Sequence, residues 1–395
     1  MHLLHLISSV SSAGGGPAEA VRLLSAVHTR EGHSVEVASL DGPGTPQTQD
    51  YPFPLHALGP GRTQYSYTPR LLPWLRQHRP RFDAVIVNGL WQYHSFAAWR
   101  ALQGTSTPYF VYPHGMLDPW FAREFPLKHA KKWLYWPWAD YRVLRDAAAV
   151  LFTCEEEKLL TRESFWLYRA HELVTGLGVS EPPGNLDAAA ATFLTAYPAL
   201  RGKRLALFMG RLHPKKGCDL LLDAFAATLA REPAWHLVMA GPDAHPDQAG
   251  WSAQLRAQAA ALGIAERVTW PGMLTGTLKW GALGAAEVFV LPSHQENFGI
   301  AVVEALACGR PVLITRPVNI WREIAQARAG FVAEDTAAGA RELLDGWRQV
   351  PLEEHAAYRA RARACFEQHF HIDASAARLL DAIRSAPAAN PGAPS

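Results

Sequence analysis

Short apolar runs alternate with longer segments of helical periodicity along the first half of the chain. The runs are continuous and bounded by turn residues, which is typical of strands buried on both faces of a parallel sheet. A helical pattern at 18–30 follows the first run. This alternation predicts a mostly parallel sheet with right-handed crossovers. The predicted strands are 3–7, 35–40, 84–87, 109–112 and 148–152.

The same alternation restarts after a segment rich in proline and glycine. Residues 178–185, Gly-Val-Ser-Glu-Pro-Pro-Gly-Asn, are the best candidate for a linker. Two consecutive α/β halves predict two Rossmann-like domains that face each other across a cleft. The strands predicted for the second half are 205–209, 236–240, 268–270, 288–291 and 312–315.

Bulk properties narrow the class of protein. The 395 residues suffice for two domains with sizeable cores, and 49% hydrophobic with 19% charged residues is a globular profile. The net charge of +2 gives no reason to expect nucleic acid. The amino terminus is apolar but short and lacks a basic leader, so a signal peptide is not expected, and no apolar run is long enough to span a bilayer. Four scattered cysteines argue for a reducing compartment and against a disulfide or zinc framework, so we expect a cytoplasmic protein.

Two glutamates in the stretch 292–311, PSHQENFGIAVVEALACGRP, lie eight positions apart. Glu296 falls in the loop at the carboxyl end of a predicted strand, and Glu304 lies a little over one turn into a helix predicted from Gly299 to Cys308. Ligands bind at that edge of an open α/β sheet. A carboxylate on so apolar a helix is costly to bury unless a partner such as a pair of sugar hydroxyls hydrogen-bonds it.

This stretch resembles the Glu-x7-Glu signature of glycosyltransferase family 4, a retaining family with the GT-B fold. The resemblance covers nearly the whole chain and is strongest at 208–330. It implies that Glu296 contacts hydroxyls of the donor sugar and that Glu304 holds the ribose of the nucleotide. Asn297 stands where many relatives have glycine, so its side chain is expected to shape the donor pocket. The backbone at the helix start is expected to bind the phosphates, through Phe298, Gly299 and Ile300.

The resemblance also implies the domain bounds. An acceptor-binding domain is expected at 1–180 and a donor-binding domain at 181–368. A helix at 369–385 is expected to return to the first domain. The tail 386–395 consists of Ala, Pro, Asn, Gly and Ser and is expected to be disordered. The overall texture is similar to that of bacterial exopolysaccharide and lipopolysaccharide glycosyltransferases.

A basic loop, Gly-Arg-Leu-His-Pro-Lys-Lys-Gly, follows the predicted strand 205–209. When a nucleotide sugar reacts, negative charge builds on the departing diphosphate, and two cations at a strand–helix junction stabilise that charge. By resemblance these cations are Arg211 and Lys216, although the neighbouring Lys215 leaves the register of the lysine open. The alternative is a solvated basic loop.

The sequence contains no Asp-x-Asp pair, which metal-dependent transferases use to hold a divalent ion against the diphosphate. We therefore expect no divalent metal and no other cofactor, with a UDP- or GDP-sugar as donor substrate. A site that scattered carboxylates assemble in space stays an alternative.

A glycine-rich loop follows the first predicted strand. By resemblance it approaches the diphosphate and the acceptor, and Gly15 and Gly16 are the residues whose backbone would come close because no Cβ intervenes. Dinucleotide binding is the alternative, since Asp41 ends the second strand where an acid of an NAD site would fall. Glu19 at the third glycine position of that fingerprint disfavours it.

Three further segments are candidates for the site, the first and the last of them through the resemblance. His114, after the strand 109–112, is the candidate for positioning the reacting centre, with a purely structural histidine as the alternative. Residues 88–94 follow another strand at the same predicted edge and either line the acceptor pocket or pack as an ordinary loop. Gly272 and Met273 lie where the family contacts the base.

Residues 120–145 interleave aromatic and basic side chains. Such a segment suits a lipid headgroup interface, and many family members use lipid-linked acceptors. Domain packing with a solvated basic face also explains the composition. Peripheral contact with the inner face of a membrane is thus one of two interpretations.

Together these patterns predict a retaining enzyme that moves a hexose from a UDP- or GDP-sugar to a hydroxyl of a glycan or lipid-linked acceptor, in surface polysaccharide biosynthesis. The rivals are a phosphorylase or nucleotide-sugar epimerase on the same fold, a non-catalytic nucleotide-sugar-binding subunit, and an NAD oxidoreductase.

Overall fold

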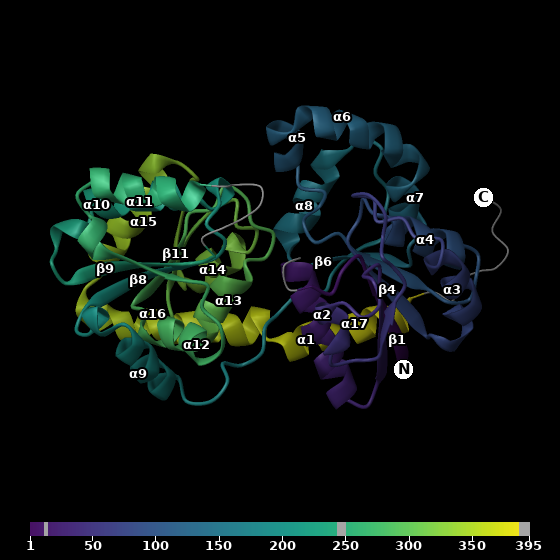
Figure 1. The fold of residues 1–395 in the computed structure, drawn as a ribbon, viewed down its shortest axis with the longest axis horizontal. Coiled ribbons are helices and arrows are strands. Elements are labelled where there is room, and N and C mark those ends of the chain that lie inside the picture. Colours follow the sequence, from purple (N-terminus) through teal and green to yellow (C-terminus); the bar gives the residue numbers. More distant parts are fainter. Residues whose placement is uncertain (12–14, 243–249, 387–395) are drawn as a thin grey trace. The chain divides into compact units, whose positions relative to one another are not determined.

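The structure is a computed structural model that describes residues 1–11, 15–242 and 250–386 (Figure 1). The chain forms two compact units. Unit 1 comprises Met1–Gly178 and the chain from Ile372 onward, and unit 2 comprises Val179–His371. The tail expected to be disordered lies, apart from Ala386, outside the described residues.

Unit 1 is built on a seven-stranded parallel sheet of order β3-β2-β1-β4-β5-β6-β7. The buried strands are the ones that the apolar runs predict. The sequence missed β3 and β7, because both are short and half-exposed at the sheet edges and therefore carry no continuous apolar run. The strands are β1 His2–Ile7, β2 Ser34–Ser39, β3 Leu55–Ala57, β4 Ala84–Asn88, β5 Tyr109–Tyr112, β6 Ala149–Phe152 and β7 Glu172–Val174.

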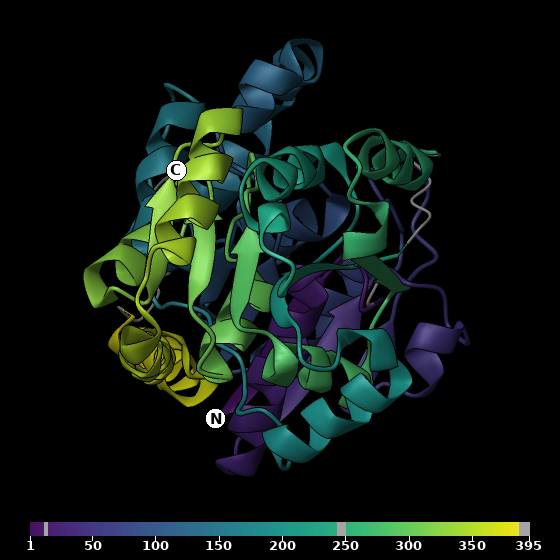
Figure 2. The same cartoon turned by 90° about the vertical axis from the view of Figure 1, so that its left-hand side faces the viewer.

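Unit 2 has a six-stranded parallel sheet of order β10-β9-β8-β11-β12-β13. Helices cover both faces of this sheet (Figures 1 and 2). The missed strand is again a half-buried edge, β13. The strands are β8 Arg204–Met209, β9 Trp235–Ala240, β10 Val268–Gly272, β11 Val288–Leu291, β12 Val312–Thr315 and β13 Gly330–Ala333.

Helices connect the strands of unit 1, and a last helix, α17, returns to this unit and packs against α1. His28 Nε2 bonds the carbonyl of Ala376 on α17 at 3.1 Å, and Arg378 donates to the carbonyl of Thr175 at 2.7 Å. The helices are α1 Gly16–Arg30, α2 Pro46–Gln49, α3 Leu71–His78, η2 Arg79–Arg81, α4 Tyr93–Leu102, α5 Trp120–Glu124, α6 Pro126–Tyr135, η3 Trp136–Trp138, α7 Asp140–Arg145, α8 Glu155–Ser164 and α17 Ile372–Ser385.

In unit 2 the connecting helices include α13, which matches the helix predicted from Gly299 to Cys308 once these two residues are counted as its caps. No helix within the described part of the chain is long and apolar enough to cross a membrane. The helices are α9 Leu186–Ala196, η4 Pro198–Leu200, η5 Pro214–Lys216, α10 Cys218–Ala227, η6 Leu229–Arg231, α11 Trp251–Ala261, η8 Ala265–Arg267, α12 Gly276–Ala285, α13 Ile300–Ala307, α14 Trp321–Ala327, α15 Ala337–Arg348, η9 Leu352–Glu354, α16 His355–Cys365 and η10 Phe366–Phe370.

The strand orders place a topological switch point in each unit. The order reverses between β1 and β4 in unit 1, and between β8 and β11 in unit 2. At such a point the loops after the two central strands diverge to opposite faces of the sheet and leave room for a ligand at the carboxyl edge. The loops after β8 and β11 carry the basic and acidic residues singled out above, so the topology of unit 2 gathers them at one edge.

Candidate functional site

The loops that follow β8 and β11 are in direct backbone contact. Gly217 has φ 62°, and a Cβ on it would lie 2.1 Å from the carbonyl oxygen of Pro292, so only glycine permits this approach. The carbonyl of Lys215 accepts from His294 N at 2.8 Å and from the hydroxyl of Ser293 at 3.0 Å. The basic loop is thereby held against the start of the acidic loop.

The two predicted site residues Lys216 and Glu296 are ion-paired within this contact. The side chain of Lys216 is 10% exposed, and its ammonium hydrogen-bonds the carboxylate of Glu296. Burial by itself raises the pKa of that carboxyl, but the positive charges of Lys216 and, more weakly, of Lys215 and Arg211 outweigh it and hold the pKa below its ordinary value. Glu296 is therefore an ionised acceptor.

Arg211 lies in the same charged neighbourhood. Arg211 follows β8 and is exposed. Its positive charge helps to lower the pKa of the Glu296 carboxyl. The structure thus brings Arg211 and Lys216, which share one loop, together with Glu296, which lies 80 positions after Lys216.

The backbone on both sides of Glu296 is fixed by a neighbouring loop. The amide of Glu296 donates to the carbonyl of Pro317 at 2.9 Å, and its carbonyl accepts from the amide of Asn319 at 2.9 Å. The side-chain amide of Asn319 also donates to Oδ1 of Asn297, at 3.4 Å. The predicted donor-shaping residue Asn297 is therefore oriented by the loop after β12.

At the turn into α13, the predicted site residues are placed to contact a ligand mainly through their backbone. Gly299 caps the helix with φ 74°, where any Cβ would crowd Val302 and Glu296 at 3.2 and 3.3 Å. Phe298 is 4% exposed and packs against Phe370, so it can offer a ligand its backbone alone. Ile300 is the first helical residue, where a backbone N–H has no partner within the helix.

Glu304 has a partner that the sequence did not reveal. Lys279 on α12 donates to Oε1 of Glu304 at 2.6 Å, and the glutamate is 9% exposed. The pair satisfies the requirement that a carboxylate on so apolar a helix be hydrogen-bonded. Since Lys279 comes from a different helix, no spacing in the sequence could have identified it.

The predicted base contacts lie at the end of β10. Gly272 has φ 72°, and its carbonyl accepts from Gly241 N at 2.9 Å. Met273 follows with its side chain 68% exposed. An exposed methionine beside a fixed strand end offers an adaptable apolar surface for a flat base.

In unit 1 the predicted glycines stand at the start of α1. Gly15 caps the helix with φ 78°, and among the described residues no heavy atom beyond its chain neighbours lies within 4 Å of a Cβ built on it. Gly16 is the first helical residue. The earlier part of this loop, 12–14, lies outside the described residues.

His114 adopts a left-handed conformation, φ 51°, immediately after β5. Asn88, the last residue of β4, donates from Nδ2 to the carbonyl of Ile86 at 3.1 Å, so its Oδ1 accepts from Nε2 of His114 at 3.2 Å. Nε2 is therefore the protonated nitrogen of a neutral ring. Burial lowers the pKa of His114 to about 4, which keeps the ring uncharged at neutral pH.

The turn at His114 has a second support that sequence reasoning missed. Glu157 on α8 is buried and accepts from the amide of Gly115 at 2.6 Å. It also accepts from the amide and hydroxyl of Thr153, at 2.8 and 2.6 Å. A fully engaged carboxylate thus clamps the residue that follows the strained histidine.

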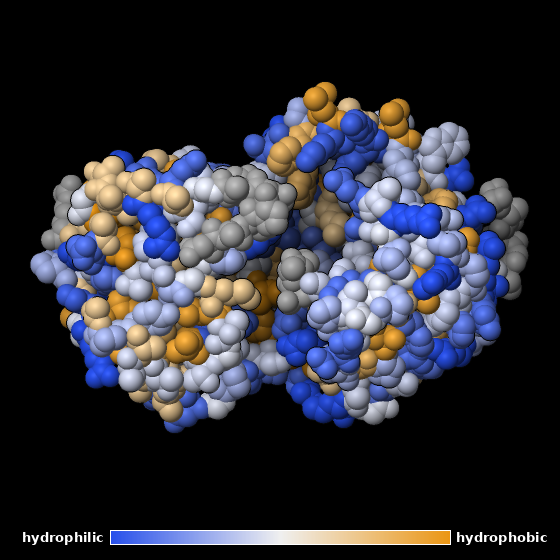
Figure 3. All heavy atoms as spheres, in the orientation of Figure 1, coloured by the Kyte–Doolittle hydropathy of each residue, from blue (hydrophilic) through white to orange (hydrophobic). Residues whose placement is uncertain are grey.

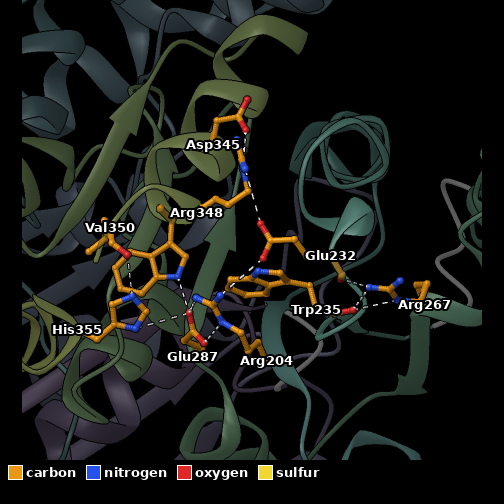
Figure 4. Close-up of polar contacts among 10 residues, drawn as sticks. Arg204, Glu232, Trp235, Arg267, Glu287, Asp345, Arg348, Val350 and His355 are labelled. Carbon is orange, nitrogen blue, oxygen red and sulfur yellow. Dashed lines mark hydrogen bonds and ion pairs between the residues drawn. The ribbon is translucent and has the colours of Figure 1, made fainter. Parts of the chain in front are cut away.

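A different charged network of unit 2 lies at the opposite end of the strands (Figure 4). Glu287, which precedes β11, accepts two bonds of 2.8 Å from Arg204 and one of 2.9 Å from Nε1 of Trp347. The charges of Arg204 and Glu287 neutralise each other, and the bond from Trp347 ties the beginnings of the strands to α15. Their arrangement is that of a structural network away from the carboxyl edge.

Among residues 1–11, 15–242 and 250–386, no group of three or more His, Cys, Asp or Glu side chains is placed to hold a metal ion.

Two family models match the chain, one in each half. Residues 15–178 match "Glycosyl transferase 4-like domain", and residues 196–363 match "Glycosyl transferases group 1". The range 196–363 contains both loops of the switch point of unit 2, and the range 15–178 contains α1 and the loop after β4.

Curated relatives are similar to parts of the chain. A mannosylfructose-phosphate synthase of Agrobacterium fabrum is 32% identical over 133 residues, which are 33% of this chain and 29% of that protein. A D-inositol 3-phosphate glycosyltransferase of Segniliparus rotundus is 31% identical over 52% of this chain and 44% of its own length. The enzyme of that name from Streptomyces avermitilis is 28% identical over 78% of this chain and 67% of its own length. The alignments with the first two relatives thus span less than half of their lengths.

Solved structures are similar over nearly the whole chain. HepE of Anabaena in complex with UDP and glucose has a TM-score of 0.76 at 17% identity and covers 98% of this chain and 100% of its own. Sucrose-phosphate synthase of Thermosynechococcus elongatus has a TM-score of 0.74 at 19% identity and covers 97% and 98%. This likeness, with the two parallel sheets, confirms the predicted GT-B fold.

Proposed function

The chain belongs to the glycosyltransferases of the family 4 type, and from this we propose that it moves a hexose from a UDP- or GDP-sugar to a hydroxyl of a glycan or lipid-linked acceptor, with retention of configuration. The observation that carries the proposal is the contact of Lys216 with Glu296 beside Arg211 at the switch point of unit 2. It joins phosphate-binding cations to a sugar-binding carboxylate at one edge.

In this proposal Arg211 and Lys216 bind the diphosphate. The lysine ammonium has three donors, so it can keep its bond to Glu296 while it donates to a phosphate oxygen. Negative charge grows on the diphosphate as the glycosidic bond breaks, and fixed cations stabilise that charge most in the transition state. The reaction then needs no divalent metal.

The glutamates would hold the two sugars of the donor. Glu296 is ionised and can accept from hydroxyls of the hexose, while Glu304, oriented by Lys279, can accept from the ribose. Asn297, Phe298, Gly299 and Ile300 would contribute beside them as the start of α13, and Gly272 and Met273 at the base. These roles are part of the proposal.

Residues of unit 1 enter the proposal through the roles that the family resemblance gives them. His114, neutral and held at a fixed angle by Asn88, would position the donor sugar and the acceptor hydroxyl, largely through its main chain. Gly15 and Gly16 would let the backbone at the start of α1 approach the diphosphate.

The comparisons support a uridine nucleotide as the first candidate donor. HepE structures contain UDP and UDP-glucose, and WaaG, with a TM-score of 0.69, is described as a glycosyltransferase involved in lipopolysaccharide biosynthesis. We accordingly propose a cytoplasmic role in the synthesis of a surface polysaccharide.

A thermal-shift screen against UDP, GDP and ADP and their common sugars tests the donor. A ligand that binds only the folded protein raises Tm, by an amount that grows with its concentration over Kd. We expect UDP or GDP and one matching sugar nucleotide to raise it. No shift with any of them would overturn the proposal. Consumption of the donor without an acceptor would instead indicate a hydrolase or an epimerase, and NMR of the anomeric proton in the product tests retention.

A further inference from the structure

Helix α6 exposes the apolar residues that an amphipathic helix normally packs inward. None of its ten residues is buried. Leu127 and Leu134 are 81% and 79% exposed, and they lie seven positions apart, which places them on one face of the helix. Trp138, one turn further on, is 69% exposed. An apolar stripe therefore faces outward along α6 and η3.

Aromatic side chains pack together beneath the apolar stripe. Phe165 stacks on Trp136 at 4.1 Å and contacts Trp133 at 5.0 Å. Trp133 in turn stacks on Trp166 at 5.8 Å, and Trp166 is 82% exposed. Packing of the opposite face of α6 thus fixes the outward orientation of its leucines.

Cations flank the stripe. Arg123, Lys128 and Lys131 are exposed, and Glu124 is the one acidic residue of the sequence between 120 and 138. The ammonium of Lys128 lies 4.9 Å from the ring centre of Phe125, itself 43% exposed. Figure 3 shows apolar residues beside strongly hydrophilic ones over α5 and α6, at the top of the view.

We propose that this surface, comprising Leu127, Leu134, Trp138 and Trp166 with Lys128 and Lys131, docks on an anionic lipid bilayer. Side chains of this size insert at the boundary of the headgroups and acyl chains, where tryptophan is favoured, while the flanking lysines meet lipid phosphates. A border in which exposed cations outnumber acidic residues fits a negatively charged lipid surface better than a polar protein face of mixed charge. Docking would bring a lipid-linked acceptor to unit 1. Only this link to the acceptor rests on the proposed function; the docking itself does not.

Co-sedimentation with vesicles tests the docking without any assay of transfer. We expect wild-type protein to be retained by vesicles of phosphatidylcholine with phosphatidylglycerol at low salt, and much less by phosphatidylcholine alone. Leu127→Ser with Leu134→Ser should lower the partition coefficient about tenfold or more, and so should Lys128→Glu with Lys131→Glu. All these residues are exposed, so Tm should not change.

Matched controls lie in unit 2. Leu352→Ser removes a leucine that is 71% exposed, and Lys203→Glu with Arg341→Glu reverses two exposed charges. Both variants should bind vesicles like the wild type.

Wild-type protein that stays in solution with anionic vesicles at low salt overturns the inference. So does full retention of both variants of the docking surface. A dimer in gel filtration that only Leu127→Ser with Leu134→Ser dissociates, with unchanged vesicle binding, would assign the surface to a second copy of the chain instead. Loss of vesicle binding with intact donor binding in the thermal-shift screen separates this inference from the proposed function.

Discussion

The ammonium of Lys216 hydrogen-bonds the carboxylate of Glu296 across 80 positions of sequence. Both groups are largely withdrawn from water, and a charge so placed is costly to leave without its partner. The pair therefore fixes each side chain before a ligand arrives, which reduces the ordering cost of binding. Each residue also keeps bonding capacity for a ligand, the lysine as donor and the glutamate as acceptor.

The two neighbouring lysines of the β8 loop should differ sharply. Lys216→Ala removes a proposed transition-state contact and should lower kcat/KM about 100-fold to 1000-fold, or about 3–4 kcal/mol. Lys215→Ala is the matched control, because the backbone carbonyl of Lys215 makes the loop contacts and survives the change. Steady-state kinetics with the donor found by thermal shift decide the matter. Equal losses in the two variants would contradict the assignment of Lys216.

The ion pair of Lys279 with Glu304 should govern donor affinity more than turnover. Lys279→Met removes the ammonium that bonds the buried carboxylate, and Glu304→Gln removes the charge. Each should raise the donor KM about tenfold with little change in kcat, since hydrogen bonds to charged groups contribute about 1.5–3 kcal/mol. Lys203→Met, an exposed lysine in the same unit, is the control. An unchanged KM in both variants would remove Glu304 from the donor site.

Glu157 should act through the turn at His114. Glu157→Ala removes the carboxylate that accepts from the amides of Gly115 and Thr153, and it should cost about 1–3 kcal/mol of stability. If the turn positions the reacting centre, kcat should fall more than KM rises, and Glu157→Gln should restore part of it. Glu163 is exposed on the same helix, so Glu163→Ala is the control for both the stability and the kcat measurement. Loss of stability at wild-type kcat would mean that Glu157 is structural only.

Acid should destabilise unit 1 through His94. This side chain is fully buried, its Nε2 bonds the carbonyl of Asn88 at 3.0 Å, and burial lowers its pKa to about 4. The folded pKa lies below the unfolded value, so the unfolded chain binds the extra proton as pH falls from about 6.5 to about 4, and stability falls with it. His94 alone should contribute a slope of up to about 1.4 kcal/mol per pH unit in that window. Urea denaturation should show this slope in the wild type and a smaller one in His94→Gln; identical slopes would refute it.

Chelation should leave transfer intact. If Arg211 and Lys216 supply the stabilising charge, excess EDTA should change kcat less than about twofold, and added magnesium should not raise it. A known metal-dependent transferase, assayed in parallel, confirms that the chelator is effective. Complete loss of activity that a divalent ion restores would refute metal independence.

The local pattern predicted a large part of the fold. The apolar runs located the buried strands, and the helix that carries Glu304 was predicted from Gly299 to Cys308, because glycine and apolar periodicity act on the chain within a few residues. The pattern did not predict the edge strands β3, β7 and β13, because a strand that is only half buried needs no continuous apolar run.

What the sequence alone determined is the set of loops that would carry polar groups at the carboxyl ends of strands, including those of Arg211, Glu296 and His114. The tertiary structure alone decided which groups meet. Lys216 with Glu296, Lys279 with Glu304, and His114 with Asn88 are pairs from separate elements. Their meeting follows from strand order and crossover packing, which bring distant residues to one edge at spacings that the linear chain does not encode.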